Sequence, residues 1–425
     1  MTIPTVPETT ARVVTSVEEW TSALGDPAVR AIVVRGQLSN VPTSRLAPGQ
    51  SLSGEDSGCE VSFAPDKDGL QLSADNTVRG LGLHASAAQR AIFNDYSVSD
   101  LGRIAIAGVT ATGQVQILAR DAVRSGHVEV DGLDIVEADA SARADMPRGY
   151  GVSVLQGAFT LWNMQPDAAC VVTASLAGLS AGRPGAPVVG SGVFVAGGGY
   201  SGGGLVAPLL ETGAIYSEGG IAPGTANRIS GAVFTGFGAR IEAVRNLGPV
   251  MTHGVNDMVL DNWGTVAFWT AEDKLVSLAP SGIGFVNFGT INELKVLAPL
   301  ETFGQGARGF NVYDGTVGIA EFDRITTHGD GAIGVQISKP IGKLVVNHGI
   351  ETFGGTGESL VKGVLTTLAA IGLSIKPGGS AQEIDINGGL TAHGDGVAAL
   401  ELLGPVWALR VDGRLVTAGE DGANA

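Results

Sequence analysis

The chain has 425 residues, of which 44% are hydrophobic, 16% are charged and 65 are glycine. This composition excludes a disordered chain, which would hold fewer apolar residues, and no triplet glycine period indicates collagen. The 26 basic and 42 acidic residues give a net charge of −16. Such a charge disfavours nucleic acid and anionic membranes as partners, and it disfavours long-range capture of polyanionic glycans.

No targeting or membrane-spanning segment is visible. Residues 1–30 lack a basic start followed by an apolar stretch, which a secretory signal would show. No apolar run reaches the roughly 18 residues that a transmembrane helix needs. Taken as written, the chain is therefore expected to be cytoplasmic and not to enter membranes.

Residues 1–30 predict an N-terminal cap. Ser16 followed three residues later by Glu19 is a capping box, so a short helix is expected through about Leu24. A strand-like segment follows over residues 31–36. Residues 31–225 then predict irregular rungs of a repeat, with strands around residues 103–109, 114–118, 128–130 and 152–155.

A glycine-rich stretch interrupts this part of the chain. Residues 176–225 contain the run Gly197 to Gly204, which holds only Tyr200 and Ser201 besides glycine. Glycine tolerates positive φ and close backbone approach, so wide loops at the corners of rungs are expected. A phosphate-binding loop is disfavoured, because no Lys-Ser/Thr pair follows.

Residues 226–422 hold a regular repeat of about 25 residues. Its turn position recurs after 25, 25, 25, 25, 40 and 25 residues, at Gly254, Ala279, Gly304, Gly329, Gly354, Gly394 and Gly419. Such a period means stacked identical units. Three apolar columns recur with it, which begin at Val250, Leu260 and Leu294: Val250, Leu275, Leu300, Ile325, Ile350, Leu390 and Leu415; Leu260, Phe285, Phe310, Val335 and Leu360; Leu294, Ile319, Leu344, Ile384 and Leu409.

Three short apolar segments per repeat predict three short strands per rung, because segments of this length are too short for helices. Like residues on successive rungs would stack along the axis and bury a continuous core. The interval of 40 residues predicts an insertion over roughly residues 365–379, on one face of the solenoid. The last rung shows no C-terminal cap, so we expect a possible homo-oligomer contact there.

The order of elements resembles the right-handed parallel β-helix of the pectate-lyase-like superfold. In that fold a capping helix precedes an Ile-Val-Val-x-Gly strand, an x-Ile-x-Gly turn and an Asn-Val-x-Ile-x-Asn-Leu rung. Similar segments stand here at residues 31–36, 52–54 and 76–83. The resemblance implies an all-β chain, a three-sheet right-handed parallel β-helix with a short capping helix. One domain over residues 1–425 is expected.

Strand alternation predicts where a site would lie. If Leu260 and its column point inward, the neighbouring columns that begin at Val259 and at Asp261 point outward, and an exposed aromatic row begins at Trp263. Aromatic faces beside amide and carboxylate groups have the form of a sugar-binding groove. The predicted substrate-binding residues are Trp263, Asn311, Tyr313, Asp314 and Gln336. The alternative is that parity breaks at the strand end and the aromatic rings stack inside the core.

Asp257 and Asp261 are the candidate acid/base residues on this face, with Arg308 to stabilise developing charge. Glu301 and Glu351 lie two rungs apart, about 10 Å by rung spacing, which exceeds the separation in inverting glycosidases. The three histidines before turns, His253, His328 and His393, are interpreted as corner residues. No metal-ligand spacing is seen, and no cofactor or metal is expected.

Two functions remain open at this point. The first is a carbohydrate-active β-helix protein, a glycoside hydrolase or polysaccharide lyase that acts on a neutral or weakly charged glycan. The second is a non-catalytic solenoid that serves as a scaffold or binds a partner. Converging carboxylates in a cleft would favour the first function, and a featureless surface would favour the second.

Overall fold

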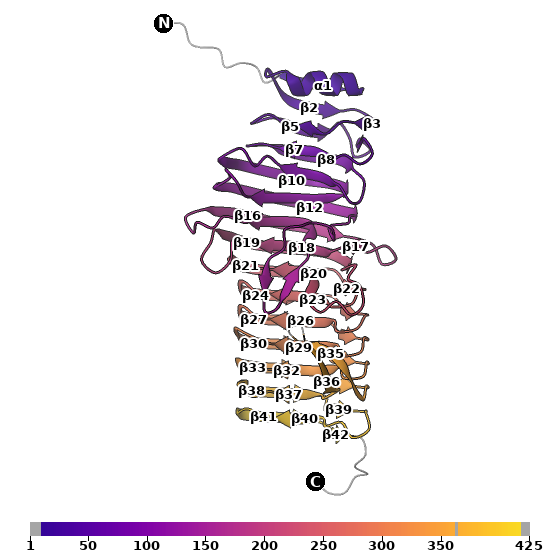
Figure 1. The fold of residues 1–425 in the computed structure, drawn as a ribbon, viewed down its shortest axis with the longest axis vertical. Helices are drawn as coiled ribbons and strands as arrows, with labels where there is room; N and C mark the ends of the chain where they lie inside the picture. Colours follow the sequence, from indigo (N-terminus) through magenta and orange to yellow (C-terminus); the bar gives the residue numbers. More distant parts are fainter. Residues whose placement is uncertain (1–9, 362–363, 418–425) are drawn as a thin grey trace.

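The computed structural model describes residues 10–361 and 364–417 and confirms the predicted parallel β-helix. Rungs stack along one long axis, with a single helix at one end of the stack (Figure 1). No helix among the described residues is long and apolar enough to cross a membrane.

The predicted capping box forms at the start of helix α1 (Val17–Gly25). The Ser16 hydroxyl accepts a hydrogen bond from the Glu19 N–H at 3.2 Å, and the Glu19 carboxylate accepts one from the Thr15 N–H at 2.7 Å. Trp20 is buried beneath the helix, where its indole N–H donates to the Ser44 hydroxyl at 2.8 Å. The helix thus covers the core at the N-terminal end of the stack.

Each regular rung contributes one strand to each of three faces. A 25-stranded sheet wraps around the first two faces. The first face holds the longer strands: β1 (Thr10–Val14), β2 (Val29–Val34), β5 (Ser51–Gly54), β8 (Thr77–His84), β10 (Asp100–Thr112), β12 (Ser125–Glu137), β16 (Val171–Ala181), β19 (Gly204–Glu218), β21 (Ala239–Asn246), β24 (Thr265–Ala271), β27 (Thr290–Val296), β30 (Thr316–Phe322), β33 (Pro340–Val346), β38 (Ser380–Asn387) and β41 (Val406–Asp412).

The second face holds short strands: β3 (Gln37–Val41), β6 (Glu60–Phe63), β17 (Val188–Val189), β22 (Val250–Thr252), β25 (Leu275–Ser277), β28 (Leu300–Thr302), β31 (Ile325–Thr327), β34 (Ile350–Thr352), β39 (Leu390–Ala392) and β42 (Leu415–Thr417). The third face is a 15-stranded sheet whose stacked strands are β4 (Ser44–Arg45), β7 (Leu70–Leu72), β9 (Arg90–Asn94), β11 (Gln114–Ala119), β15 (Gly157–Asn163), β18 (Ser191–Ala196), β20 (Arg228–Thr235), β23 (Asp257–Asn262), β26 (Ile283–Asn287), β29 (Arg308–Val312), β32 (Ile333–Ile337), β37 (Leu373–Ile375) and β40 (Leu400–Leu402).

Two antiparallel hairpins depart from the rungs. Strands β13 (Arg148–Gly149) and β14 (Val152–Val154) form the first, which we call the Tyr150 hairpin. Strands β35 (Thr356–Val361) and β36 (Val364–Ala369) form the second, which is the insertion within the 40-residue interval. The predicted place of that insertion, residues 365–379, is wrong, because the extra residues follow Gly354 directly and the rung resumes at β37. The strand predicted at residues 152–155 belongs to the Tyr150 hairpin and not to a rung.

The column that begins at Val250 is confirmed, because its members pair in register on the second face. Two other assignments are wrong. Ile319 is expected to pair with Leu294, but Ala320 takes this place, because the register between β27 and β30 is shifted by one residue from the 25-residue spacing. Ile319 is exposed as a result. Val335 pairs with Leu373 and not, as predicted, with Leu360. The side chain of Leu360 lies outside the described part of the structure.

The last described rung leaves apolar side chains uncovered. Leu409 and Leu415 lie in register with core residues Ile384 and Leu390, yet both are exposed. An oligomer contact through this rung stays a proposal. Gly419, the last predicted turn residue, lies outside the described part of the chain.

The turn column has a steric cause. A Cβ on Gly329 would lie 2.1 Å from the Gly304 carbonyl oxygen, and a Cβ on Gly354 would lie 1.9 Å from the Gly329 carbonyl oxygen. No real Cβ approaches a backbone oxygen so closely, so the corners at Gly304, Gly329 and Gly354 can stack on the preceding corners only without a side chain, whereas the corner at Ala279 accommodates a Cβ.

Replacing Gly329 by alanine should therefore destabilise the solenoid by about 1–3 kcal/mol, the range for overpacking a rigid site. Thermal unfolding followed by circular dichroism would measure the change. Gly204→Ala is the matched control, because a Cβ there would meet nothing within 4 Å. Equal melting temperatures for Gly329→Ala and wild type would contradict the steric origin of the column.

Candidate functional site

One outward column on the third face lies where the sequence predicts it. Asp261, Val286, Asn311 and Gln336 pair in register on successive rungs. Val286 packs in a second hydrophobic cluster outside the solenoid, whereas Leu260 packs in the core, so this column faces outward.

The other predicted outward column, which begins at Val259, is wrong. Val259 packs in the solenoid core beside Leu260, and a Cβ on Gly284 would meet the core side chain of Leu300 at 2.5 Å. Two consecutive residues therefore face inward on these strands. The glycines at this position make room for the core rather than form the floor of an outer groove.

The aromatic row faces outward but is not exposed. Trp263, Phe288 and Tyr313 retain only 3%, 9% and 6% of their surface, which corrects the predicted open groove. They also do not stack inside the core, as the alternative held. Together with Phe237 on the preceding rung, they belong to the cluster outside the 15-stranded sheet. We call these four residues the aromatic wall.

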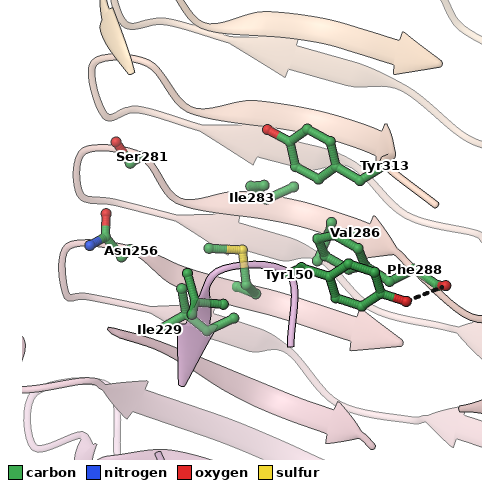
Figure 2. A pocket seen from close by; sticks show the side chains of 10 residues that line it. Tyr150, Ile229, Asn256, Ser281, Ile283, Val286, Phe288 and Tyr313 are labelled. Carbon is green, nitrogen blue, oxygen red and sulfur yellow. Dashed lines mark hydrogen bonds between the residues drawn. The ribbon is translucent and has the colours of Figure 1, made fainter. Parts of the chain in front are cut away.

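The Tyr150 hairpin covers the aromatic wall (Figure 2). A Cβ on Gly149 would lie 2.7 Å from the Trp263 ring and 2.8 Å from the Phe237 ring, so only glycine allows the hairpin to come so close. Tyr150 and Gly151 form its two-residue turn with φ of +53° and +86°. Positive φ at both positions is the geometry of a type I′ turn, and tyrosine is an unusual residue there.

The Tyr150 ring rests on three rings of the wall. It stacks on Phe288 with centroids 4.2 Å apart, meets Trp263 edge-on at 5.2 Å and lies 5.8 Å from Phe237. Its hydroxyl lies 2.9 Å from the Tyr200 hydroxyl and donates to the Phe288 carbonyl oxygen at 3.3 Å. Burial, followed by the bond to Tyr200, raises the pKa of the Tyr150 phenol.

The glycine-rich run places Tyr200 at this site. The ring of Tyr200 lies 4.4 Å from Phe237, yet 82% of the residue is exposed to solvent. Close packing of the neighbouring glycines explains their number: a Cβ on Gly198 would lie 2.2 Å from the Gln165 carbonyl oxygen. Sequence reasoning placed loops here but missed Tyr200, because nothing local tells an exposed platform from an ordinary loop tip.

A hollow of about 380 Å³ lies between Tyr200 and the wall. We call it the aromatic groove. Its polar lining comes from Arg240, Thr265, Thr290 and Asp314, and its aromatic lining from Tyr150, Tyr200, Phe237, Trp263 and Phe288. Its volume lies within the range of small-molecule sites. A mostly apolar pocket lies on the other side of Tyr150, lined by Val152, Ile229, Met258, Ile283 and other residues, and Figure 2 shows this inner pocket.

Asp314, Trp263 and Tyr313 are the predicted site residues that line these hollows. The Asp314 side chain is 39% exposed and lies 3.4 Å from the Lys339 ammonium group. Asp314 is thus the predicted residue best placed to meet a ligand in solution.

Asp261 is completely buried beneath the cover. Its register partners on the two neighbouring rungs are Phe234 and Val286, both in the outer cluster. Among the described residues, no hydrogen bond of ordinary geometry reaches either carboxyl oxygen. Burial raises the pKa of Asp261 well above its usual range, and the nearby indole N–H of Trp263 offsets this only in part. Burial thus favours the protonated form of this carboxyl group.

Asp257 lies at a corner and holds turns together. Its Oδ2 accepts the N–H groups of Gly219 at 2.9 Å and Gly254 at 2.8 Å, and its Oδ1 accepts the Ser230 hydroxyl at 2.6 Å. Burial raises the pKa of Asp257 to about 6, although these hydrogen bonds oppose the shift. The two aspartates predicted together as acid/base candidates therefore have different surroundings.

Arg308 is buried at the other end of the column, beneath the second hairpin. It donates from Nη1 to the Gly306 carbonyl oxygen at 3.0 Å and from Nε to Gln336 at 3.5 Å, and it lies 5.8 Å from the centroid of the Tyr313 ring. Ser359 of β35 donates to the same Gly306 oxygen at 2.7 Å. Asn311 is buried on the same strand, and its side-chain amide has no hydrogen-bond partner among the described residues.

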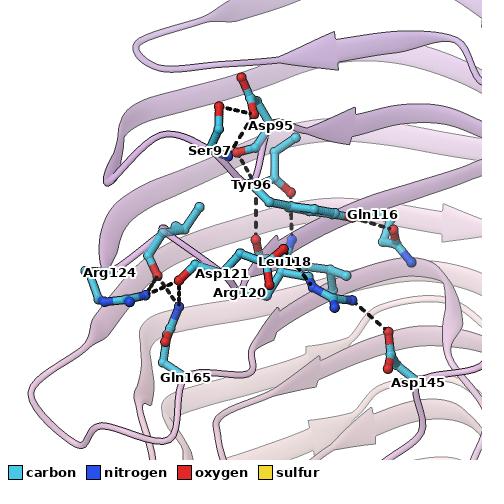
Figure 3. A network of polar contacts seen from close by, with 12 residues as sticks. Asp95, Tyr96, Ser97, Gln116, Leu118, Arg120, Asp121, Arg124, Asp145 and Gln165 are labelled. Atoms are coloured by element: carbon cyan, nitrogen blue, oxygen red, sulfur yellow. Dashed lines mark hydrogen bonds and ion pairs between the residues drawn. The ribbon is translucent and has the colours of Figure 1, made fainter.

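Residues 139–155 carry the Tyr150 hairpin, and we call this segment the strap. Polar contacts fasten the strap to the N-terminal half of the third face. Arg120 pairs with Asp145 at 2.9 Å, as Figure 3 shows. Arg143 donates to Gln114 at 2.7 Å, and the Gln156 amide donates to the Asp145 carbonyl oxygen at 2.9 Å. Beyond the tip, the Ser153 N–H donates to the Asn227 carbonyl oxygen at 2.9 Å. The base of the hairpin is thus held on both sides.

The histidines before the turns form a separate surface feature on the second face. Phe303, His328, Phe353 and His393 stack with centroids 4.5, 5.3 and 4.3 Å apart and planes within 8° of parallel. The two inner rings of this stack, His328 and Phe353, are each covered on both faces by neighbouring rings. They therefore expose their edges rather than their faces to solvent. The interpretation of these histidines as corner residues agrees with their place in the rungs.

Comparison of the chain with protein-family models, curated proteins and solved structures found no match. The chemistry of the groove is therefore the basis for a proposed function.

The surroundings of Asp257 predict a pH effect on stability. Because its folded pKa of about 6 exceeds the ordinary aspartate value of 3.8, the folded state binds more protons than the unfolded state between these pH values. Its contribution to stability is thus greatest at low pH and is lost as pH rises through about 6. Two pKa units correspond to about 3 kcal/mol. Asp257→Asn should remove this loss of stability at higher pH, because asparagine does not ionise. Its amide group can still hydrogen-bond the Ser230 hydroxyl, and its amide oxygen can still accept the N–H groups of Gly219 and Gly254.

The measurement is the unfolding free energy of wild type and Asp257→Asn at pH 4 and pH 7. The variant should gain stability relative to wild type at the higher pH. Asp167→Asn, at an exposed turn where Asp167 accepts only the Ala169 N–H, serves as the matched control. A constant difference between Asp257→Asn and wild type at both pH values would contradict the raised pKa.

Proposed function

We propose that this chain is a carbohydrate-binding β-helix protein that holds a neutral or weakly charged glycan in the aromatic groove. The observation that carries this proposal is Tyr200, a large aromatic ring left 82% exposed above a hollow lined by further rings. An isolated exposed aromatic residue needs no explanation, but one that continues an aromatic wall marks a binding surface. Flat aromatic faces suit the apolar faces of pyranose rings.

Polar groups at the edge of the groove suit sugar hydroxyl groups. Thr265 and Thr290 pair in register on successive rungs, and Asp314 follows at the next rung. Arg240 supplies donors on the preceding rung. Because the rungs repeat at about 4.8 Å, these groups form a row along the solenoid axis. A row of this kind suits an extended chain of sugars better than a single compact ligand.

Catalysis by the same site would rest on Asp261. A carboxyl group whose pKa is raised by an apolar environment can hold and donate a proton, which is the task of a general acid in glycoside hydrolysis. Asp261 has this environment, whereas Asp257 is committed to turn hydrogen bonds and Arg308 lies beneath the second hairpin. The proposal therefore retains Asp261 as the acid and gives Asp257 and Arg308 structural roles.

The second candidate is a non-catalytic solenoid that binds without turnover. The burial of both predicted carboxylates favours it, because Asp257 and Asp261 are each fully buried. In this case the groove still binds a glycan, and Asp261 serves only to line the covered face. The two candidates differ in whether bound glycan is cleaved.

Removing Tyr200 tests the binding proposal. Tyr200→Ala should weaken the affinity for a bound oligosaccharide about tenfold, which corresponds to about 1.4 kcal/mol. Calorimetric titration with a panel of soluble neutral and acidic oligosaccharides would measure it. Trp407→Ala is the matched control, because Trp407 is also a large exposed ring, 62% accessible, on β41 of the first face. No binding of any sugar to the wild type would end the proposal.

Asp261→Asn separates cleavage from binding. The amide has the same shape as the carboxyl but cannot donate the proton, so cleavage of the bound glycan should stop while affinity stays within about twofold. Mass spectrometry of the oligosaccharide after long incubation would detect products. Unchanged cleavage in the variant would remove Asp261 from the reaction, and no cleavage by the wild type would favour the non-catalytic candidate.

A further inference from the structure

The Tyr150 ring occupies a place that a ligand ring would fill. It lies against Trp263, Phe288 and Phe237, and its hydroxyl meets one hydroxyl and one carbonyl group. We infer that this place is a ring-binding subsite of the groove which the chain fills with its own Tyr150, and that one hexopyranose ring takes it when the hairpin tip lifts. This inference rests on the proposed glycan binding.

The hairpin is built with a fixed base and a separable tip. The base is fastened by Arg143, Asp145 and Gln156 on one side and by Ser153 on the other. Beyond these contacts, the side chains of the tip form hydrogen bonds through the Tyr150 hydroxyl, to Tyr200 and to the Phe288 carbonyl oxygen. The tip is therefore held mainly by ring contacts, the interactions that a ligand ring could replace.

The backbone at the tip favours release. Tyr150 has φ of +53°, a left-handed conformation that is unfavourable for a residue with a Cβ. Strain of this kind persists only where other contacts over-determine it. Stacking of Tyr150 on the wall supplies those contacts, so a ligand that displaces the ring also relieves the strain.

Tyr150 separates two hollows that would join once it leaves. The aromatic groove and the inner pocket are both lined by Tyr150 and Phe288. The joined trough would continue toward Asn256 and Ser281, which line both the inner pocket and a further hollow beside the second hairpin. A lifted tip thus joins the short groove to a trough that crosses the third face along its strands, from Phe288 toward Asn256 and Ser281 (Figure 2), and this length fits an oligosaccharide.

The chemistry of the subsite suits a sugar ring. The wall offers ring faces of Phe288 and Trp263 for the apolar side of a pyranose. The Phe288 carbonyl and the Tyr200 hydroxyl, which now bond the Tyr150 hydroxyl, would bond sugar hydroxyl groups instead. Asp261 lies on the covered face two residues before Trp263, and its carboxyl oxygens have no ordinary hydrogen bond among the described residues. A sugar hydroxyl would be a suitable partner.

The test is a competition experiment. If Tyr150 must leave, the measured affinity is the intrinsic affinity reduced by the fraction of open hairpin. Tyr150→Ala should therefore bind the oligosaccharide found for the wild type about tenfold more tightly. Tyr150→Phe keeps the ring and should bind only about twofold to threefold more tightly. Ser153→Ala, at the fastened base, is the matched control and should match the wild type.

Gly149→Ala tests the same point with Tyr150 retained. Its Cβ would collide with the Trp263 and Phe237 rings, so the tip should lift and affinity should rise. This variant keeps the inference falsifiable if Tyr150→Ala does not fold. Weaker binding by Tyr150→Ala would show that Tyr150 contacts the ligand directly, and unchanged binding would show that it does not compete. Either result overturns the inference.

A measurement without sugar separates this inference from the proposed function. Hydrogen exchange in the wild type should be faster at the amides of residues 149–152 than in β20 and β23 beneath them. In a Trp407→Phe background, Gly149→Ala should raise acrylamide quenching of Trp263. If no sugar binds and these signals appear, the hairpin is a movable cover and the sugar assignment is wrong. Slow exchange of the tip, equal to that of the rungs, overturns the cover itself.

Discussion

The constraint on which this structure depends is the stacking of like positions at rung spacing. Each rung can bury its apolar face only against the rungs beside it, so the side chain at each inward position must fit the one above and below. The same spacing excludes a Cβ from the corner occupied by Gly304, Gly329 and Gly354, where the carbonyl of one rung lies against the next. Periodicity in the sequence is thus the direct record of this stacking.

At outward-facing positions, the stacking of rungs does not require a particular residue type, and such positions are usually polar. The outer side of the third face differs, because it carries apolar side chains. Phe237, Trp263, Phe288 and Tyr313 place apolar rings on the outer side of the sheet. Such a surface needs a cover in water, and the strap of residues 139–155 and the β35–β36 hairpin supply it. Both covers are chain segments that leave the rungs, so the candidate site exists because the repeat is interrupted.

This division explains which features the sequence predicts. The helix cap, the 25-residue rungs and the column beginning at Val250 follow from local or periodic patterns, and each is found. The outward column at Asp261 follows from alternation, but alternation fails at Val259, because two neighbouring residues face inward. Leu360 fits the apolar pattern of a rung strand although it belongs to the inserted hairpin. Burial of Trp263 depends on Gly149, more than a hundred residues earlier, and no local pattern connects them.

The cover also sets the chemistry of what it hides. With Tyr150 in place, Asp261 lies in an apolar environment that raises its pKa and so favours the neutral form of its carboxyl group. Water entering beneath a lifted tip would favour the ionised form, and a sugar ring that closes the subsite again would restore the neutral form. If the tip lifts as we propose, the position of Tyr150 sets both the length of the trough and the protonation of the carboxyl group buried beside it. The burial of Asp261 is for this reason compatible with a role as proton donor. In that role, Asp261 would act only when a ligand ring, and not water, has replaced Tyr150.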